Sequence, residues 1–525
     1  MPRSVARFLW EAAERWSDKP AIVSRQRSVT FSELYREALS TAECLKELGI
    51  TPGDRVGICM EKSVDQVSVI LGVLFANAMI VPILPRLKQP NIRHIVENSG
   101  MVALVTDADR MQEVTAFRDN TQLITGHGEV DEDWPNLAYM RKYIQPRLFF
   151  DRIGMDSAAI IYSSGTTGRP KGILISHRNL ADGADIVAEY LGTTEEDRIA
   201  CVLSFNFDYG LNQIWQTLRK GATLILHNFA LPNDFFILLA EQRITALPVM
   251  PVILSQMLVK RLKARTDTLD FSSLRYVCTT GGRISQEMID DLKATFPHTR
   301  IYSMFGLTEA FRGTYLEPEK LATHPTSIGR SIPGCQVMIL GPDGEECAPG
   351  EVGELVQRGA TVTKGYWQDQ EATARVFRQH SRFPGEMLVY SGDSAYRDED
   401  GYLYFVGRRD EMIKTKGFRV SPTEVEAEAV SHPDLKAAVA FAVPNIAVGE
   451  DVGCAYTTES GDPLPEKMLK QYLKTRLPSH MVPAHLVHFD HFPITGNAGK
   501  FDRSTIKAES YERLGIELGE TPPHG

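Results

Sequence analysis

Apolar positions along this chain alternate between two periods. Residues 32–48 carry apolar side chains at helical spacing and are followed by Gly49, which predicts a helix ending there. Short apolar runs, most of them separated by helical stretches, predict buried strands at 55–60, 101–106, 158–162, 198–203, 222–226, 274–279 and 300–304. Strands that alternate with amphipathic helices are typical of an α/β architecture.

One uncharged, mostly apolar segment, residues 67–84, approaches the length of a membrane-spanning helix. Asn77 interrupts this segment, and Pro82 and Pro85 break its end. We therefore expect no membrane span, but a buried helix at about 65–77 that leads into a short buried strand at about 78–83.

The pattern changes near residue 330, where Gly, Pro and short strands dominate. Strands predicted at 334–340 and 353–358 flank the turn 341–344, which indicates a β-rich subdomain. A charged stretch at 408–410 precedes a smaller α/β unit. We predict an N-terminal domain of two α/β-sheet subdomains plus a β-rich subdomain over residues 1–409, and a small α+β domain over 410–525.

Length, charge and cysteine spacing limit the classes of function that this chain can have. A length of 525 residues corresponds to two to four folding units at roughly 100–200 residues each. The formal net charge of -10 repels nucleic-acid phosphates, and no run of five Lys/Arg residues offsets it. Seven dispersed cysteines without Cys-x-x-Cys or zinc-ligand spacing predict reduced thiols in the cytoplasm. The N-terminus has no long apolar segment typical of a signal peptide.

A loop rich in glycine and hydroxyl groups follows the strand predicted at 158–162. It reads Tyr-Ser-Ser-Gly-Thr-Thr-Gly-Arg-Pro-Lys-Gly over residues 162–172, so it offers many N–H and O–H donors and the point charge of Lys171 to a polyphosphate. The spacing is not that of a Walker loop. Composition alone is equally consistent with a surface Ser/Gly turn.

Four further motifs follow in order. They are Tyr-Ser-Met-Phe-Gly-Leu-Thr-Glu at 302–309, Tyr-Ser-Gly-Asp at 390–393, Gly-Arg-Arg-Asp at 407–410 with its continuation to 420, and Pro-Ile-Thr-Gly-Asn-Ala-Gly-Lys at 493–500. Together with the loop at 162–172, they resemble the motifs of the adenylate-forming superfamily, which contains acyl-CoA synthetases, nonribosomal-peptide adenylation enzymes and luciferases.

The resemblance implies an ATP site with Mg²⁺. Glu309 would hold the metal, Phe305 would lie against adenine and Thr308 would touch the α-phosphate. The implied nucleotide-binding set is Ser163, Ser164, Gly165, Thr166, Thr167, Gly168, Lys171, Gly281, Gly282, Phe305, Gly306, Thr308, Asp393, Arg408 and Arg419. Without the resemblance, Glu309 is consistent with a helix N-terminal charge and Asp393 with a turn residue.

The same resemblance implies a mobile C-terminal domain. Lys500 matches the catalytic lysine, Asp410 the interdomain hinge, and Lys416 and Gly417 the loop that lines the pantetheine tunnel. Lys171, Thr308, Glu309 and Lys500 would share the stabilisation of charge during catalysis. Taken alone, a lysine near a C-terminus such as Lys500 is most often a surface residue, and charges such as those at 408–419 ordinarily form a solvated face.

The acid would bind near residues 203–213. Phe207 and Asp208 resemble the pair with which amino-acid-activating members bind the substrate ammonium, although a helix-start aspartate is the simpler alternative. By rough register, the acid site would also contain Tyr209, Asn212, Cys278, Thr280, Met304 and Gly313. We expect Arg312 to face solvent rather than to pair with a second carboxylate.

The resemblance thus predicts an AMP-forming ligase that activates a carboxylic acid, favouring an amino acid, with MgATP. The acyl group would pass to the phosphopantetheine thiol of a carrier protein, as in secondary metabolism; the alternative acceptor is free coenzyme A, with a fatty or aryl acid. The chain would act as a monomer or homodimer, with neither nucleic acid nor a membrane as partner. A catalytically inactive relative is disfavoured because Lys171, Glu309, Asp393 and Lys500 are all present.

Overall fold

The structure is a computed structural model that describes residues 4–87, 89–128, 134–145, 152–163, 170–229, 231–258, 268–282, 284–408, 411–415, 418–445, 449–495 and 500–516. Within these ranges, the side chains of residues 252, 414, 418, 419, 449, 495 and 500 are not described. The chain divides into two compact units. The first is Met1–Val337 with Val356–Tyr390, and the second is Met338–Leu355 with Ser391–Gly525.

A nine-stranded sheet of the first unit has the order β15-β14-β13-β12-β11-β9-β10-β1-β2. Its strands are β1 (Pro20–Val23), β2 (Ser28–Thr30), β9 (Arg198–Cys201), β10 (Thr223–Leu226), β11 (Ala246–Val249), β12 (Tyr276–Thr279), β13 (Arg300–Phe305), β14 (Thr314–Leu316) and β15 (Arg330–Ser331). The six strands from β13 to β1 run parallel, as expected where helices separate the strands along the chain.

A six-stranded sheet of the same unit has the order β6-β5-β3-β4-β7-β8. Its strands are β3 (Arg55–Cys59), β4 (Met79–Pro82), β5 (Ala103–Asp107), β6 (Gln122–His127), β7 (Ser157–Ser163) and β8 (Lys171–Ser176). All its pairs are parallel except the β7–β8 hairpin. The predicted α/β architecture with two sheets is thus confirmed.

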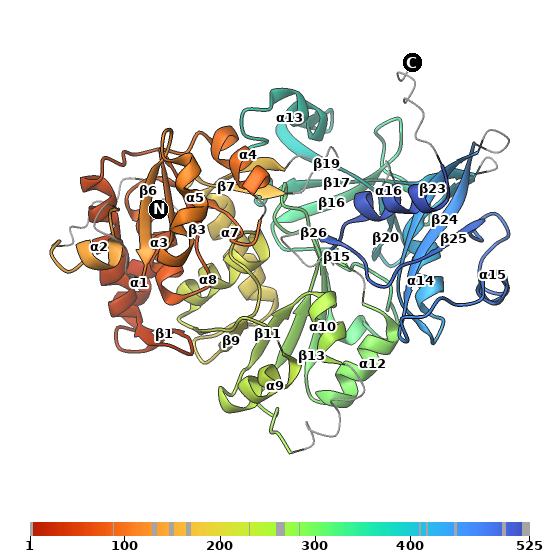
Figure 1. Cartoon of the computed structure of the whole chain (residues 1–525), viewed down its shortest axis with the longest axis horizontal. Helices are drawn as coiled ribbons and strands as arrows, with labels where there is room; N and C mark the ends of the chain where they lie inside the picture. Colours follow the sequence, from red (N-terminus) through yellow and green to blue (C-terminus); the bar gives the residue numbers. More distant parts are fainter. Residues whose placement is uncertain are drawn as a thin grey trace. The chain divides into compact units, whose positions relative to one another are not determined.

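Helices form a layer that contacts both sheets (Figure 1). The described helices of this unit are α1 (Arg7–Arg15), α2 (Phe31–Glu47), α3 (Val64–Phe75), α4 (Gln89–Ser99), α5 (Met111–Val114), α6 (Leu137–Met140), α7 (His177–Tyr190), α8 (Asp208–Lys220), α9 (Pro232–Glu241), α10 (Pro251–Met257), α12 (Gln286–Thr295) and α13 (Gln370–Val376). Helices α3 and α7 contact the six-stranded sheet, whereas α2 and α8 contact the nine-stranded sheet. Helix α2 packs on α3 and α7 packs on α8, so apolar faces are covered between the sheets.

The uncharged segment at 67–84 forms most of α3 and then β4, as predicted. Asn77 takes a left-handed conformation (φ 61°) at the turn between them, which asparagine tolerates better than most residues. Both elements are almost fully buried in the unit. In the described part of the chain, no helix is long and apolar enough to cross a membrane. All seven cysteines are free thiols.

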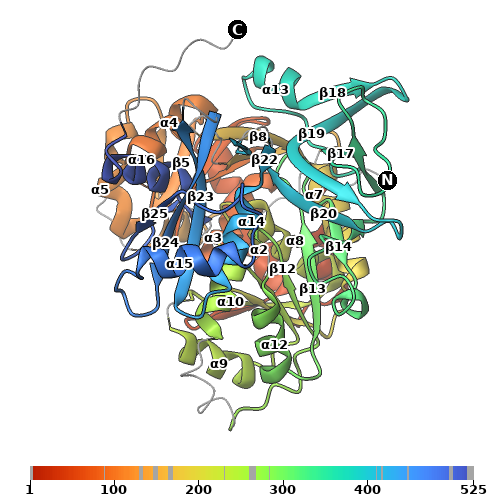
Figure 2. The same cartoon turned by 90° about the vertical axis from the view of Figure 1, so that its right-hand side faces the viewer.

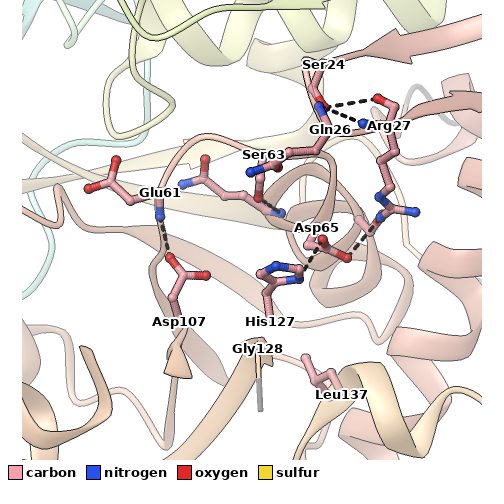
Figure 3. A network of polar contacts seen from close by, with 12 residues as sticks. Ser24, Gln26, Arg27, Glu61, Ser63, Asp65, Asp107, His127, Gly128 and Leu137 are labelled. Atoms are coloured by element: carbon pink, nitrogen blue, oxygen red, sulfur yellow. Dashed lines mark hydrogen bonds and ion pairs between the residues drawn. The ribbon is translucent and has the colours of Figure 1, made fainter. Parts of the chain in front are cut away.

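A network of ion pairs joins the two sheets of the first unit (Figure 3). Arg27, in the turn between β1 and β2, donates hydrogen bonds to Asp65 of α3 at 2.9 Å and to Glu37 of α2 at 2.7 Å. His127, at the end of β6, lies 3.0 Å from Asp65. Nearby, Asp107 accepts a 2.7 Å hydrogen bond from the backbone N–H of Glu61, and burial raises the pKa of this carboxyl to about 6.

A β-rich sheet follows along the chain. It is predicted from the Gly, Pro and short strands that dominate the sequence from about residue 330. It has the order β16-β17-β19-β18, with β20 beside β19. Its strands are β16 (Cys335–Leu340), β17 (Gly353–Gly359), β18 (Phe377–His380), β19 (Phe383–Arg397) and β20 (Leu403–Arg408). The chain passes from one unit to the other within β16, β17 and near the middle of β19.

The remaining part of the second unit is a small α+β fold (Figure 2). Its strands are β21 (Ile413–Thr415), β22 (Phe418–Val420), β23 (Leu435–Asn445), β24 (Gly449–Thr458), β25 (His485–His488), β26 (Ile494–Thr495) and β27 (Lys500–Phe501), and its helices are α14 (Pro422–Val430), α15 (Glu466–Lys474) and α16 (Arg503–Arg513). Alternate residues of β23 pack against α14 and α15 on one face and against α16 on the other. The fold class predicted from the sequence is therefore confirmed.

Candidate active site

The predicted phosphate-binding loop connects the two strands of the β7–β8 hairpin. Ser163 ends β7 and is paired in register with Lys171, which begins β8. Ser164, Gly165, Thr166, Thr167 and Gly168 lie outside the described residues. The loop therefore follows an apolar strand, as predicted, and the hairpin holds Lys171 at its base.

Two side chains of the first unit contact Glu309, and a third, Lys171, lies against one of them. The phenol of Tyr366 donates a 2.6 Å hydrogen bond to Oε1 of Glu309. The ammonium of Lys171 lies 5.4 Å from the centroid of the Tyr366 ring, within the range of a cation–π contact. Thr363 fixes the backbone, because its hydroxyl donates to the carbonyl of Glu309 at 2.8 Å. The structure thus brings together Lys171 and Glu309, two residues that lie far apart in the sequence.

The sequence analysis missed Tyr366. This residue belongs to a segment that runs along β8, where the N–H of Leu174 donates to the carbonyl of Gly365 at 2.9 Å and that of Trp367 donates to Gly172 at 2.7 Å. Gly365 has a φ of 107°, a conformation that favours glycine. The sequence feature that could have indicated Tyr366 is the triplet Gly-Tyr-Trp, in which a glycine precedes two aromatic residues within an otherwise polar stretch.

The predicted adenine-binding residues gather at the carboxyl edge of the nine-stranded sheet. Strands β12 and β13 are parallel, with Thr279 opposite Ser303, so Gly281 lies just after the end of β12 and Phe305 lies at the end of the neighbouring β13. Gly281 has a φ of 84°. A Cβ at Gly306 would lie 2.9 Å from the Cα of Arg312, so only glycine fits where this loop folds back. In open α/β sheets, ligands bind beyond the carboxyl ends of the strands.

The donor set at this edge fits Mg²⁺ shared with a nucleotide. Glu309 supplies one carboxylate, and the Thr308 hydroxyl precedes it in the same turn. Among the described residues, no group of three or more His, Cys, Asp or Glu side chains could hold a metal by itself. This composition suits Mg²⁺, which is commonly bound by one or two carboxylates together with substrate phosphates.

The predicted acid-binding residues form a second cluster around α8. Phe207 is the N-cap of this helix and Asp208 its first residue. The hydroxyl of Tyr209 donates to the carbonyl of Cys278 at 2.8 Å. The buried Met304 accepts a 3.0 Å hydrogen bond from Tyr190, an aromatic residue at the end of α7 that the sequence analysis missed. Thr280, directly after β12, is also buried.

The expectation that Arg312 faces solvent is wrong. Arg312 is 2% exposed, and its Nη1 lies 3.7 Å from Oδ2 of Asp208. Its Cζ lies 4.5 Å from the centroid of the Tyr209 ring. The backbone is held as well, because the N–H of the next residue, Gly313, donates to the carbonyl of Phe305 at 2.9 Å. A buried guanidinium needs such partners, and no periodic pattern in the sequence indicates that this loop turns inward.

The predicted ribose-binding residues, Asp393 and Arg408, both lie in the second unit. Asp393 of β19 lies opposite Arg408 of β20, and their side chains form an ion pair at 3.4 Å. Asp393 is buried, and its N–H donates to the Ser391 hydroxyl at 3.0 Å. The structure therefore brings these two residues together. Asp410, Lys416 and Gly417 lie outside the described residues.

Lys500 stands on a short hairpin of the second unit. Its backbone begins β27 and pairs with Thr495 of β26, while residues 496–499 and the Lys500 side chain lie outside the description. Arg419 is described only as backbone of β22. Just after the hairpin, Arg503 donates a 3.1 Å hydrogen bond to the largely buried Glu426. This ion pair fixes the start of α16 and was not predicted.

Comparison with known proteins agrees with a candidate nucleotide site at the carboxyl edge of the nine-stranded sheet and with a chain that divides into two units. The profile of the AMP-binding enzyme family matches residues 9–367, and that of the AMP-binding enzyme C-terminal domain matches residues 424–499. The chain belongs to the AMP-binding enzyme family. The predicted membership in the adenylate-forming superfamily is confirmed.

Curated relatives include tyrocidine synthase 1 of Brevibacillus parabrevis, which is 29% identical over 513 residues, covering 96% of this chain and 45% of the relative. Surfactin synthase subunit 1 of Bacillus subtilis (strain 168) is 28% identical over 523 residues, covering 97% of this chain and 14% of the relative. The chain thus spans less than half the length of these relatives.

Solved structures with the same fold include ATP-bound MatB from Rhodopseudomonas palustris, with a TM-score of 0.88, 24% identity and coverage of 98% of this chain and 100% of that one. The o-succinylbenzoate CoA synthetase MenE from Bacillus subtilis, in complex with an acyl-adenylate intermediate, has a TM-score of 0.84 and 24% identity, covering 97% of this chain and 98% of that one. At these identities, the likeness establishes the fold.

Proposed function

We propose that this protein activates a carboxylic acid with MgATP as acyl-AMP and then transfers the acyl group to a pantetheine thiol. The observation that carries the proposal is the Glu309 carboxylate, held by Tyr366 beside Lys171 at the carboxyl edge of the nine-stranded sheet. A carboxylate with an ordered hydrogen bond and a neighbouring ammonium is suited to a metal–polyphosphate group.

In the first reaction, an oxygen of the acid attacks the α-phosphorus of ATP. A bond forms between this oxygen and phosphorus, and the bond from phosphorus to the bridging oxygen breaks as pyrophosphate leaves. Lys171, Thr308 and Lys500 stabilise the negative charge on the phosphates. Glu309 would hold Mg²⁺, which would supply positive charge to offset that of the phosphates. The nucleotide would stack on Phe305 and place its ribose on Asp393 and Arg408.

In the second reaction, a thiolate attacks the acyl carbon and AMP leaves with the electron pair of the broken C–O bond. The small domain would turn about Asp410, which removes Lys500 and brings up Lys416, Gly417 and Arg419. One site would then serve both reactions. The domain boundary at Asp410 stays a prediction.

The acceptor we favour is the phosphopantetheine arm of a carrier protein. The curated relatives are much longer chains, named tyrocidine synthase 1 and surfactin synthase subunit 1, and this chain matches a part of each. The amino-acid substrate rests on Asp208 as the partner of an ammonium group. Because Asp208 already lies beside Arg312, an unpaired buried carboxylate no longer supports that prediction by itself.

Pyrophosphate exchange tests the first reaction, since an acid-dependent exchange of label into ATP requires reversible adenylation. Lys500→Ala should lower this exchange by about 10²–10³-fold, as expected for loss of one charge-stabilising group. Thioester formation from supplied acyl-adenylate should stay unchanged. Lys507→Ala, on α16 of the same unit, is the matched control. Equal loss of both reactions in Lys500→Ala would contradict the rotating-domain mechanism.

The acceptor is decided by offering coenzyme A and a pantetheinylated carrier protein side by side to the same acyl-adenylate. We expect faster thioester formation on the carrier. Faster transfer to coenzyme A would reject the carrier-protein proposal while leaving acid activation intact.

A further inference from the structure

Arg312 is a buried cation whose hydrogen-bonding capacity is only partly used. Its Nη1 edge faces Asp208 at 3.7 Å, and the face of its guanidinium lies 4.5 Å from the Tyr209 ring centroid. Within the described part of the chain, Nε and Nη2 have no hydrogen-bond partner. Buried donors are almost always paired in folded proteins, so two unpaired donors on one buried cation need an explanation.

The two unpaired atoms form one edge of the guanidinium. The N–H groups of Nε and Nη2 point in the same direction, and this fork matches the two oxygens of a carboxylate. Asp208 does not use this edge. The free edge therefore has the geometry of a carboxylate-binding group.

A second unpaired polar group lies on the same face of α8. Asn212 follows Asp208 by four residues, which places the two side chains as neighbours on the helix surface. Asn212 is fully buried, and neither atom of its amide finds a partner among the described residues. Arg312 and Asn212 thus offer unused hydrogen bonds close to Asp208.

Charge balance further limits the chemical class of ligand that can bind at this site. Asp208 and Arg312 together carry no net charge. Binding a carboxylate to Arg312 would leave one excess negative charge in a buried place, which a substrate ammonium beside Asp208 would balance. A hydrocarbon tail would leave the buried donors unpaired.

We propose that the acid activated by this enzyme carries a second carboxylate, which binds to the Nε–Nη2 edge of Arg312 with help from Asn212. The charge balance favours an amino dicarboxylic acid over a dicarboxylic acid without an ammonium. This inference rests on the proposed function, because it assigns the substrate class of the same acid site.

Matched acids test the inference by pyrophosphate exchange. Aspartate is compared with its shape analogue leucine, succinate with 4-methylpentanoate, and phthalate with 2-isopropylbenzoate. In at least one pair, kcat/KM for the dicarboxylic member should exceed that of the hydrocarbon member by about 10²-fold or more, because sites built for a polar group reject analogues that lack it. A higher rate for aspartate than for succinate supports the ammonium at Asp208, and the reverse order supports a plain dicarboxylic acid.

Variants connect the preference to Arg312. In Arg312→Met, the preference within the favoured pair should fall at least tenfold while the KM for ATP stays unchanged. Arg312→Lys keeps the charge but loses the two-pronged donor edge, so it should show an intermediate preference. It also tests the inference if the methionine variant does not fold. Arg300→Met, which removes an exposed arginine at the start of β13, is the control.

Exchange driven best by a hydrocarbon acid, or an unchanged preference in both Arg312 variants, would overturn the inference and leave acid activation standing. No exchange with any acid would count against the proposed function and therefore against both.

Discussion

The phenol of Tyr366 donates a 2.6 Å hydrogen bond to the carboxylate of Glu309. This contact joins the turn after β13 to the segment that runs along β8. No described residue donates a hydrogen bond to the second carboxylate oxygen, Oε2. Groups that orient a metal-binding carboxylate are important for affinity even though they do not touch the metal.

Tyr366→Phe should therefore weaken the dependence on Mg²⁺ without abolishing activity. The apparent affinity for Mg²⁺ in pyrophosphate exchange should fall by about 10–100-fold, the usual effect of removing such an orienting group. Tyr404→Phe is a matched control, because it removes a tyrosine–carboxylate hydrogen bond of 2.9 Å to Asp398, outside the predicted site. Equal Mg²⁺ titrations for Tyr366→Phe and the wild type would contradict the role of Glu309 as metal ligand.

Gly282→Ala separates nucleotide binding from folding. A Cβ at this position would meet only Pro251, at an ordinary distance of 3.4 Å, so the change in thermal stability should be small. If adenine lies against this turn, the added methyl group blocks its approach, and the KM for ATP should rise about tenfold or more. That rise corresponds to about 1.4 kcal/mol at 25 °C. An unaltered KM for ATP with an unaltered melting temperature would remove Gly282 from the nucleotide site.

The order of strands and helices could be predicted because apolar runs and helical periods are local signals. The helix predicted at 32–48 is α2, Phe31–Glu47, which begins at a Thr30 capping box. The segment at 67–84 likewise contains the predicted helix and strand. Sheet order could not be predicted, because the pairing of β1 with β10 joins residues about 200 positions apart by contacts that leave no periodic pattern.

The sequence could assign candidate roles wherever one motif contained both the chemistry and its position, as at Thr308 and Glu309, and these roles stay predictions. Side chains that enter the site from a distant segment were missed. Tyr366 reaches Glu309 across 57 sequence positions. Arg312 turns inward only because the loop after β13 folds back, with Phe311 in a left-handed conformation (φ 44°) packed against Gly183. The burial of Arg312 depends on tertiary packing, which charge and hydropathy along the chain do not predict.

His177 should make the stability of the first unit depend on pH. It begins α7, is 1% exposed, and its Nδ1 lies 3.1 Å from the Ser4 hydroxyl. Burial lowers the pKa of His177 to about 4, whereas an unfolded histidine titrates near 6.5. The unfolded chain therefore binds the extra proton, so stability is full above about pH 6.5 and is lost as the pH falls toward 4.

This histidine alone should cost about 2 kcal/mol of stability between pH 7 and pH 5. His177→Gln should have a smaller drop in melting temperature over that interval than the wild type, whatever its stability at pH 7. His298→Gln, at an exposed histidine, should behave as the wild type. Parallel pH profiles for the wild type and His177→Gln would contradict the assignment.

The ion pair between Glu426 and Arg503 should dominate the stability of the small α+β fold. Arg503 donates to both carboxylate oxygens, and Glu426 also accepts a 2.7 Å hydrogen bond from the N–H of Ala440 on β23. The Glu426 side chain is 14% exposed, and burial raises its pKa despite the neighbouring cation. Arg503→Met leaves this carboxylate buried without its cation, at a cost of about 3 kcal/mol.

The double variant Glu426→Gln with Arg503→Met should be more stable than Arg503→Met alone, because the amide keeps the bond from Ala440 and carries no charge. Lower pH should also rescue Arg503→Met relative to the double variant, since the raised pKa lets Glu426 take up a proton in the folded state before it does so in the unfolded chain. Denaturant unfolding of Arg503→Met, Glu426→Gln, the double variant and the wild type at pH 8 and pH 5.5 measures both effects. A penalty in Arg503→Met that is independent of pH and additive with Glu426→Gln would show that the two side chains do not act as a pair.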